Sequence, residues 1–334
     1  IMDIILPTLG NAMTTLIALI DRIRMLDNDM IRLDQKIYCT KRWMEDTKNV
    51  DHINDDAFEF VDCDLLDAHS IRRAVEISKP SKVFHFAAQS FPEVSFKTPV
   101  ITLQTNTVGT THLLEAIKES EYDPVIVSVS TSEVYGSALY VPMDENHPTI
   151  PQSTYAVSKL AGERVIFTLH KEHNLPAVII RPFNSFGPNI TQPYIIPEII
   201  NQMLKSDIIK LGNLNSKRDL TFVSDTAHGI ISSLVMEGAI GEVINVGSGR
   251  AFSIRDLVTM IADILEKDVE IKVDPSRFRP FDVDTLICNY DRANRILDWT
   301  PKISVKEGLE ITIKWIKENG VNINTPFSEQ HELM

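Results

Sequence analysis

Apolar runs and amphipathic stretches alternate between residues 58 and 183. Runs rich in Val, Ile and Phe with little polar alternation are typical of strands buried on both faces. They predict strands at 58–66, 82–88, 124–131 and 177–183. Apolar residues spaced three and four apart predict helices over 69–78, 107–120 and 153–173. This order predicts an α/β fold with a doubly wound, Rossmann-like parallel sheet, whose ligands bind beyond the carboxyl ends of the strands.

The pattern changes after Phe183. A segment rich in Pro and Asn follows, and a last helix is expected over 305–320, ended by Gly320. The strand-like residues 241–249 are expected to return to the main sheet, so that a smaller C-terminal lobe is interleaved with the first. We therefore expect a dinucleotide-binding domain over 1–183, with returning segments near 220–248 and 284–295, and a mainly substrate-binding lobe over 184–330.

The composition is that of an ordinary soluble protein, with 43% hydrophobic and 24% charged residues among 334. A net charge of -13 argues against a nucleic-acid partner. Cys39, Cys63 and Cys288 are too few and too scattered for a disulfide framework or a zinc site, which predicts a reducing, cytoplasmic setting and no metal. The apolar stretch 13–20 is short and runs into charged residues, so we expect no membrane span and no signal peptide.

Tyr155 and Lys159 stand at i and i+4 of a predicted helix and so share one face. They are either a surface pair or a phenol whose pKa a neighbouring cation lowers, so that it can act as a base. The predicted strand 124–131 ends at "STSEVYG", which offers the hydroxyls of Thr131 and Ser132 and the carboxylate of Glu133. A single loop separates this strand end from Tyr155, so these groups are expected to converge on one small ligand.

Five motifs resemble, in order and spacing, the extended short-chain dehydrogenase/reductases that act on nucleotide sugars. They are "HFAAQS" (85–90), "STSEVYG" (130–136), "YAVSK" (155–159), "RPFNSFGP" (181–188) and "RDLTFVSDTAHG" (218–229). Within that group the chain looks most like the 4,6-dehydratases. "AAQSFPEVSFKTP" is similar to GDP-mannose 4,6-dehydratase, whereas "KLGNLNSKRDLTFVSDTA" looks more like the dehydratases of UDP-N-acetylglucosamine. The resemblance covers roughly residues 58 to 320.

The resemblance implies a reaction. Tyr155, held as phenolate by Lys159 and by the nicotinamide ring, would take the proton from the C4 hydroxyl as hydride leaves C4, while Thr131 orients that hydroxyl. Glu133 would remove the C5 proton as water leaves C6. Ser132 stands at the place of the acid for the leaving hydroxyl, and because serine is a poor acid, Glu133 is expected to be able to make both transfers. The product is a 4-keto-6-deoxy sugar nucleotide.

The resemblance also implies binding residues. The cofactor would contact Asp64, Leu65, Ala87, Ala88 and Gln89. The substrate would contact Ser90, Asn184, Arg218 and Arg279, whose guanidinium groups suit a diphosphate. Each assignment has a plain structural alternative, a turn aspartate for Asp64 and a solvated surface arginine for Arg218 and Arg279.

The family's glycine-rich phosphate loop is reduced here to Gly10, with Leu9, Ala12 and Thr15 at the other positions of the best alignment. Three explanations of this loop compete. The loop has a rebuilt geometry that still binds cofactor, the chain has lost cofactor affinity, or the first forty residues of the given sequence differ from the true ones. At the end of the second expected strand, Lys41 and Arg42 suit a 2′-phosphate, so the cofactor is expected to be NADP or NAD, with NADP favoured.

Three alternatives stay open. A nucleotide-sugar 4-epimerase or a decarboxylase can share "STSEVYG", and a cofactor-less sugar-nucleotide binding protein is suggested by the reduced glycine loop. Because the helices at 107–120 and 155–170 carry more apolar surface than one sheet face needs, and relatives pair through this region, a homodimer or a dimer of dimers is expected.

Overall fold

The computed structural model describes residues 2–6, 36–43, 58–189, 194–278 and 283–320. The expectations for Gly10 and Arg279 lie outside these residues.

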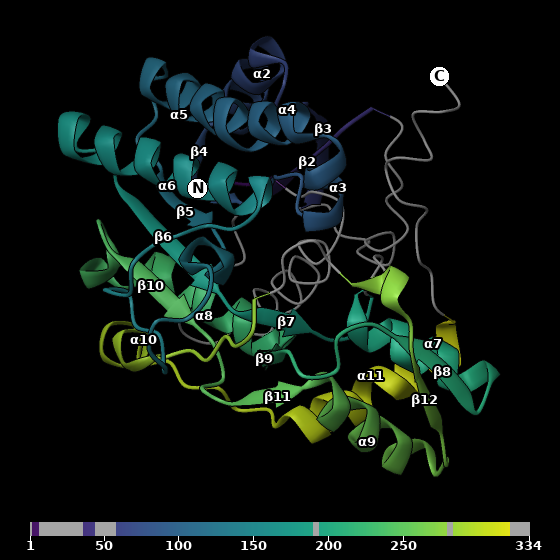
Figure 1. Cartoon of the computed structure of the whole chain (residues 1–334). Helices are drawn as coiled ribbons and strands as arrows, with labels where there is room; N and C mark the ends of the chain where they lie inside the picture. The colour runs from purple at the N-terminus through teal and green to yellow at the C-terminus, as the bar shows by residue number, and fades with distance from the viewer. Residues whose placement is uncertain (1, 7–35, 44–57, 190–193, 279–282, 321–334) are drawn as a thin grey trace.

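The larger lobe is built on a seven-stranded sheet in which all neighbouring strands run parallel. Its order is β10 (Val243–Val246), β6 (Ala177–Pro182), β5 (Val125–Val129), β4 (Pro80–His85), β1 (Met2–Leu6), β2 (Lys36–Lys41) and β3 (Phe58–Asp62). β10 comes from the second half of the chain and extends the sheet beside β6 (Figure 1). The predicted doubly wound sheet with an interleaved second lobe is confirmed.

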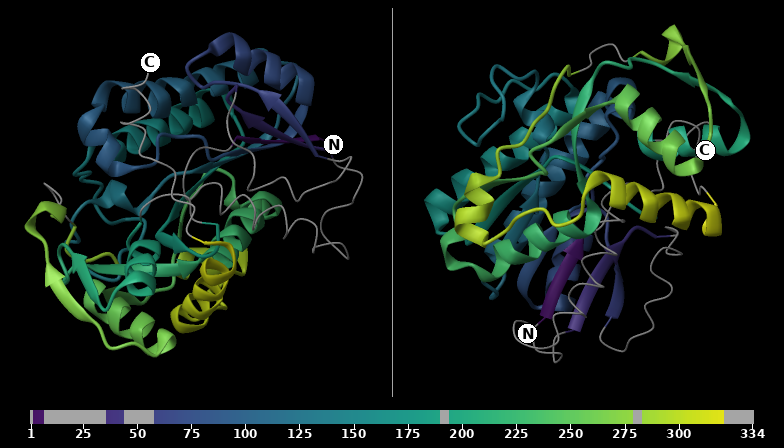
Figure 2. Two further views of the ribbon diagram at one scale, coloured as in Figure 1. Left: turned by 90° about the vertical axis from the view of Figure 1, so that its right-hand side faces the viewer. Right: turned by 90° about the horizontal axis from the view of Figure 1, so that it is seen from below.

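Side chains of the central strands alternate between two cores. Val83, Ile126 and Ile179 pack with α2 (Ala68–Ser78), α5 (Gly109–Glu119) and α6 (Thr154–His173). Phe84, Val127 and Ile180 face the other way, toward α8 (Val223–Val235) and α10 (Asp291–Leu297). Figure 2 shows these two helical layers on either side of the strands. The apolar runs of the sequence exist because both faces of the sheet are covered.

The helix expected over 107–120 begins earlier than predicted. After α3 (Pro92–Lys97), the chain forms α4 (Pro99–Leu103), passes through a π-helical turn, η1 (Gln104–Val108), and continues directly as α5. A π turn adds one residue to the helical repeat and is frequent at functional sites. It changes which side chains face α6, and one of them is Asn106.

The smaller lobe has two short sheets around its own apolar core. One has the order β11 (Ala251–Ser253), β9 (Lys217–Phe222) and β7 (Asn184–Phe186); the other pairs β12 (Glu270–Val273) with β8 (Ile208–Leu211). They pack with α7 (Ile195–Lys205), α9 (Ile254–Leu265) and α11 (Val305–Asn319). The remaining elements are the 3₁₀ turns η2 (Ser132–Tyr135), η3 (Glu237–Ala239) and η4 (Pro275–Arg277). The expected last helix is α11, which Gly320 ends.

Candidate active site

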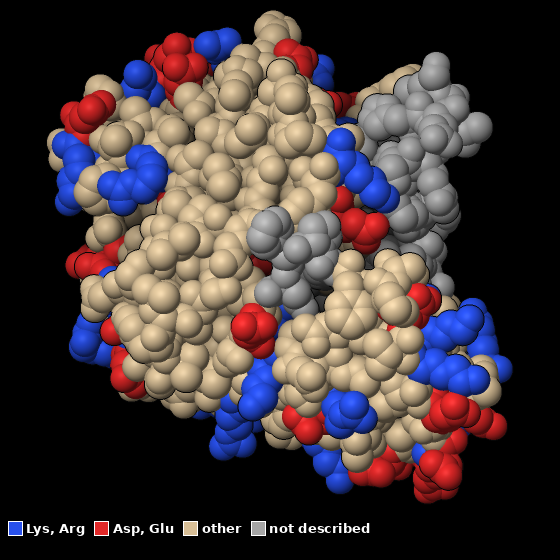
Figure 3. Space-filling model, viewed as in Figure 1, with Lys and Arg blue, Asp and Glu red and all other residues tan. Residues whose placement is uncertain are grey.

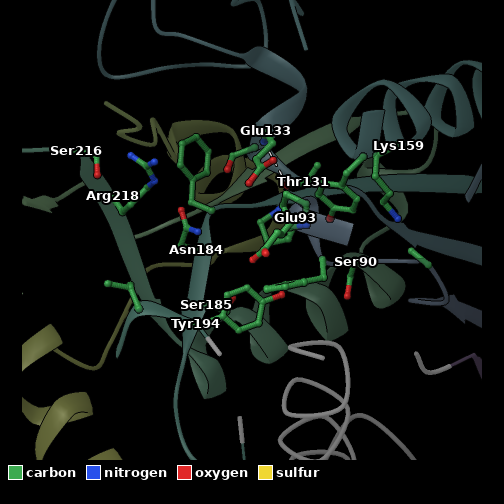
Figure 4. Close-up of a pocket in the computed structure, with 18 of the residues that line it drawn as sticks. Ser90, Glu93, Thr131, Glu133, Lys159, Asn184, Ser185, Tyr194, Ser216 and Arg218 are labelled. Carbon is green, nitrogen blue, oxygen red and sulfur yellow. Dashed lines mark hydrogen bonds between the residues drawn. The ribbon is translucent and has the colours of Figure 1, made fainter. Parts of the chain in front are cut away.

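A cavity of about 730 Å³ is lined by the carboxyl ends of β4, β5 and β6 on one side and by the smaller lobe on the other. Figure 4 shows Lys159 at one end, Arg218 at the other, and Thr131, Glu133 and Asn184 between them. All five predicted catalytic residues line this cavity: Thr131, Ser132, Glu133, Tyr155 and Lys159. Their convergence is the central observation on this site.

The residues after β5 are held by a small cap. Thr131 has extended backbone angles, and its hydroxyl accepts a hydrogen bond of 3.2 Å from the backbone N–H of Glu133, which starts η2. Ser132 is buried, whereas the Glu133 side chain is partly exposed to the cavity. The turn places three chemically distinct side chains at one strand end.

Tyr155 and Lys159 lie in the first turns of α6, which Ser153 caps by accepting from the N–H of Ala156. Both side chains are buried. Burial raises the pKa of the Tyr155 phenol well above its usual range, Glu133 and Tyr194 raise it further, and a hydrogen bond with Thr131 opposes the rise. The protein groups alone therefore shift this pKa in the direction opposite to the expected one.

Lys159 is the buried cationic side chain of this region. Burial lowers the pKa of its ammonium group to about 8, and the Glu163 carboxylate opposes that change. Burial and Lys159 together lower the pKa of His85 to about 3, so this imidazole is neutral near pH 7. Lys159 thus faces a neutral neighbour on β4 and a carboxylate on its own helix.

Asn106, in the π turn, ties the segment that follows β4 to α6. Its amide group accepts from the Gln89 N–H at 2.6 Å and donates to the Gln89 carbonyl at 2.9 Å and to the Ser158 hydroxyl at 2.8 Å. The Ser158 hydroxyl in turn donates to the Tyr155 carbonyl at 2.7 Å. Asn106 therefore positions the helix turn that carries Tyr155 and Lys159. The sequence reasoning missed it, because only the π turn brings it to this place.

A buried ion pair lies beneath the same helix. The Arg181 guanidinium on β6 donates to both Glu163 oxygens, from Nε at 2.9 Å and from Nη2 at 2.6 Å. Ser130 also donates to Glu163, and Arg181 lies over the Tyr135 ring at 4.8 Å. Such a two-pronged pair fixes α6 against β5 and β6.

Three predicted substrate contacts line the cavity: Ser90, Asn184 and Arg218. The Asn184 side-chain oxygen is buried and accepts no hydrogen bond within the described part of the chain, so it suits a ligand donor. The Arg218 guanidinium donates to the Val283 carbonyl at 2.6 Å, which holds the side chain in place. Further cavity residues that sequence reasoning missed are Glu93, Ser185, Tyr194, Ser216, Glu198 and Arg277.

The predicted cofactor residues divide into two groups. Ala88 lines the cavity, whereas Ala87 and Gln89 follow the same strand without lining it, and the Gln89 side chain braces its own loop through Phe91. The second group lies near the ends of β2 and β3, away from the cavity lining: Lys41, Arg42, Asp64 and Leu65.

Lys41 pairs with Asp62 at 3.1 Å. Asp64 accepts from the N–H of Leu66 at 2.9 Å, the turn arrangement named as its alternative. The roles of these residues stay predictions.

Within the described ranges, no three His, Cys, Asp or Glu side chains are grouped as metal ligands, and no helix is long and apolar enough to cross a membrane.

The sheet topology and the strand-end residues define a protein of the extended short-chain dehydrogenase/reductase fold. The model of one family, described as GDP-mannose 4,6 dehydratase, matches residues 26–312, and the chain therefore belongs to that family of nucleotide-sugar-modifying enzymes.

Two relatives and one solved structure illustrate the match. GDP-6-deoxy-D-mannose reductase of Pseudomonas aeruginosa is 30% identical over 69% of this chain and 78% of its own length. Human dTDP-D-glucose 4,6-dehydratase is 29% identical over 87% of this chain and 83% of its own. The structure of dTDP-glucose 4,6-dehydratase from Streptomyces venezuelae with NAD bound superposes with a TM-score of 0.85 at 25% identity, covering 96% of this chain and 98% of that one. UDP-glucose 4-epimerases are also similar in sequence and in fold.

Proposed function

We propose that the protein is an NAD(P)-dependent nucleotide-sugar 4,6-dehydratase that converts a nucleoside-diphosphate hexose to its 4-keto-6-deoxy form. The observation that carries this proposal is the meeting of Thr131, Glu133, Tyr155 and Lys159 on one cavity wall. A 4-epimerase would also need the phenol and the lysine. Dehydration needs, in addition, a base that removes the C5 proton, and the Glu133 carboxylate can supply it.

Each residue has a role in this proposal. Tyr155 accepts the proton of the C4 hydroxyl, and Thr131, already hydrogen-bonded to that phenol, orients the same hydroxyl. Lys159 supplies the positive charge that the buried phenol needs to ionise. Glu133 removes the proton at C5 and passes it to the departing C6 hydroxyl, with Ser132 positioned beside it as a relay. When hydride returns to C6, C5 takes up one proton, which balances the proton that Tyr155 gained from the C4 hydroxyl.

The residues on the cavity wall fit a dinucleotide's nicotinamide half. Ala88 leaves room at the end of β4, and Lys159 offers a buried cation with donors for ribose hydroxyls. NAD(P) would accept hydride from the sugar and return it within one turnover. The proposed preference for NADP rests on Lys41 and Arg42. Since Lys41 is paired with Asp62, a 2′-phosphate must compete with that carboxylate.

Two rival activities are epimerisation at C4 and decarboxylation. Both would use Tyr155 and Lys159 in the same way. A cofactor-less binding protein is the third reading. The deciding experiment incubates the protein and NADP or NAD with GDP-mannose or UDP-N-acetylglucosamine and follows the sugar nucleotide by mass spectrometry. Loss of one water supports the proposal. Inversion, seen by NMR as a new isomer of unchanged mass, loss of carbon dioxide from UDP-glucuronate supplied in a parallel reaction, or unchanged substrates contradict it.

The Glu133→Gln variant tests the carboxylate itself. It should oxidise C4 and then stall, so that reduced cofactor accumulates and is visible by absorbance. Glu76→Gln on the exposed side of α2 is the matched control and should turn over normally. Full turnover by Glu133→Gln would refute the assigned role.

We propose that two copies pair through α4, η1 and α6, in a cytoplasmic enzyme. Exposed apolar side chains gather there: Val100, Leu103, Val108, Val157 and Phe167. In Figure 3 the surface over α4 and the middle of α6 carries few charged side chains. Light scattering would test the pairing, and Val157→Glu should shift a dimer toward monomer.

A further inference from the structure

A second carboxylate faces the cavity, at the smaller lobe. Glu198 lies on α7, one helical turn beyond Tyr194, and its side chain is 20% exposed. Its Oε1 accepts from the Arg277 guanidinium at 2.9 Å and from the Gln202 amide at 2.7 Å. Oε2 accepts no hydrogen bond from the residues that the structure describes. The carboxylate is therefore fixed through Oε1, and Oε2 can accept a hydrogen bond from a ligand.

Arg277 reaches this position through a tight backbone approach. A Cβ on Gly212, which directly follows β8, would lie 2.6 Å from the Arg277 carbonyl oxygen, so only glycine lets the η4 segment lie this close. Asp274 caps η4 by accepting from the Ser276 N–H at 3.0 Å, and its carboxylate lies 3.8 Å from Arg277 Nε. The guanidinium is thus held beside Glu198 with donors remaining for a ligand.

This pair takes no part in the chemistry proposed above. Glu133, not Glu198, is the carboxylate that raises the pKa of Tyr155. Arg218, tethered to Val283, is the predicted diphosphate contact and lines the same cavity. A nucleoside attached to that diphosphate would extend into the smaller lobe, where Ile195, Leu211 and Phe278 offer apolar contacts to the faces of a base.

We propose that Glu198 and Arg277 read the nucleobase of the substrate and select guanine, an inference that rests on the proposed nucleotide-sugar substrate. Guanine presents the O6 acceptor beside its N1–H and N2–H donors. Arg277 supplies donors for O6, and the Oε2 of Glu198 accepts from the N–H groups. Uracil and thymine carry a carbonyl oxygen in place of the amino group, and that oxygen would face the carboxylate and be repelled.

The test measures binding of nucleoside diphosphates to the full chain by calorimetry. GDP and IDP differ only by the 2-amino group, so no variant is needed for the first comparison. We expect GDP to bind about tenfold more tightly than IDP, as for a good polar base contact, and more tightly than UDP. Equal affinity for GDP and IDP, or tighter binding of UDP, would overturn the proposal.

Glu198→Gln sharpens the comparison, because its amide presents N–H donors toward the base. This variant should bind GDP and IDP within about twofold of each other, the tenfold gap being lost. Glu270→Gln removes an exposed carboxylate from the same lobe and should keep the gap. A gap that persists in Glu198→Gln would contradict the assignment.

These measurements need neither cofactor nor turnover. If the base preference fails while water is lost from some other sugar nucleotide, only this inference is wrong. If GDP is preferred but no substrate loses water, the proposed dehydratase activity is wrong and the base contact stands.

Discussion

Two glutamate–arginine pairs lie in different lobes of this molecule. Glu163 and Arg181, beneath the predicted reaction centre, are 4% and 7% exposed, and the arginine uses both arms. Glu198 and Arg277, at the cavity wall of the smaller lobe, are 20% and 42% exposed and share one hydrogen bond. The first pair has little contact with water, whereas the second remains partly hydrated.

The difference separates two tasks. A buried pair with satisfied partners tolerates no displacement, so it can fix α6 to the strand ends within hydrogen-bond accuracy. A half-exposed pair costs little to form or to rearrange, so its free acceptor can be used for selection. In the proposed enzyme, chemistry would therefore depend on the interior of the large lobe, and base recognition on the cavity wall of the small lobe.

Removing one member of the buried pair should have the largest effect. Glu163→Gln leaves the Arg181 charge buried with a weaker partner, and we expect a loss of about 3–5 kcal/mol in the free energy of unfolding. Urea denaturation measures this loss. A loss below about 1 kcal/mol would mean that this pair contributes no more to stability than an exposed salt bridge, and would contradict the prediction.

Tyr155→Phe keeps the buried aromatic ring and removes the hydroxyl that is proposed to accept the proton. The rate of conversion of the sugar nucleotide should fall by about 100-fold or more. Binding of GDP, measured by calorimetry, should change little, because the predicted nucleotide contacts lie at the other end of the cavity. A rate within about tenfold of the original would show that Tyr155 is not the base.

Lys159 should make stability depend on pH. Its pKa is lowered to about 8 in the folded protein from 10.5, so between these values the unfolded chain binds more protons. The free energy of unfolding of the original protein, relative to Lys159→Met, should therefore rise by about 2 kcal/mol from pH 7 to pH 10. Urea titrations of both proteins across this range measure it, and a constant difference would contradict the buried cation.

Glu198→Gln should have the smallest effect on stability. It makes the same chemical change as Glu163→Gln in a partly exposed pair, and we expect a loss of no more than about 1 kcal/mol in the free energy of unfolding. The same urea experiment decides. A loss as large as that of Glu163→Gln would remove the contrast between the two pairs.

Motifs read along the chain predicted most of the cavity wall on the sheet side. The strands expected over 82–88, 124–131 and 177–183 should end at one edge of the sheet, because the carboxyl ends of parallel strands share one edge. Asn106 could not be found this way, since its place depends on the π turn. Glu198 and Arg277 could not be paired either, because they come from separate segments that only the folded lobe brings together.

The sequence by itself determined the doubly wound sheet and the placement of Tyr155 and Lys159 one turn apart on one helix, because hydrophobic period and helical spacing are local properties. Tertiary structure alone decided the electrostatics: burial lowers the pKa of Lys159 and raises that of Tyr155. It also decided which carboxylates are held by arginine and which oxygen remains for a ligand. Those properties depend on solvent exclusion and on contacts between distant segments, neither of which a linear pattern encodes.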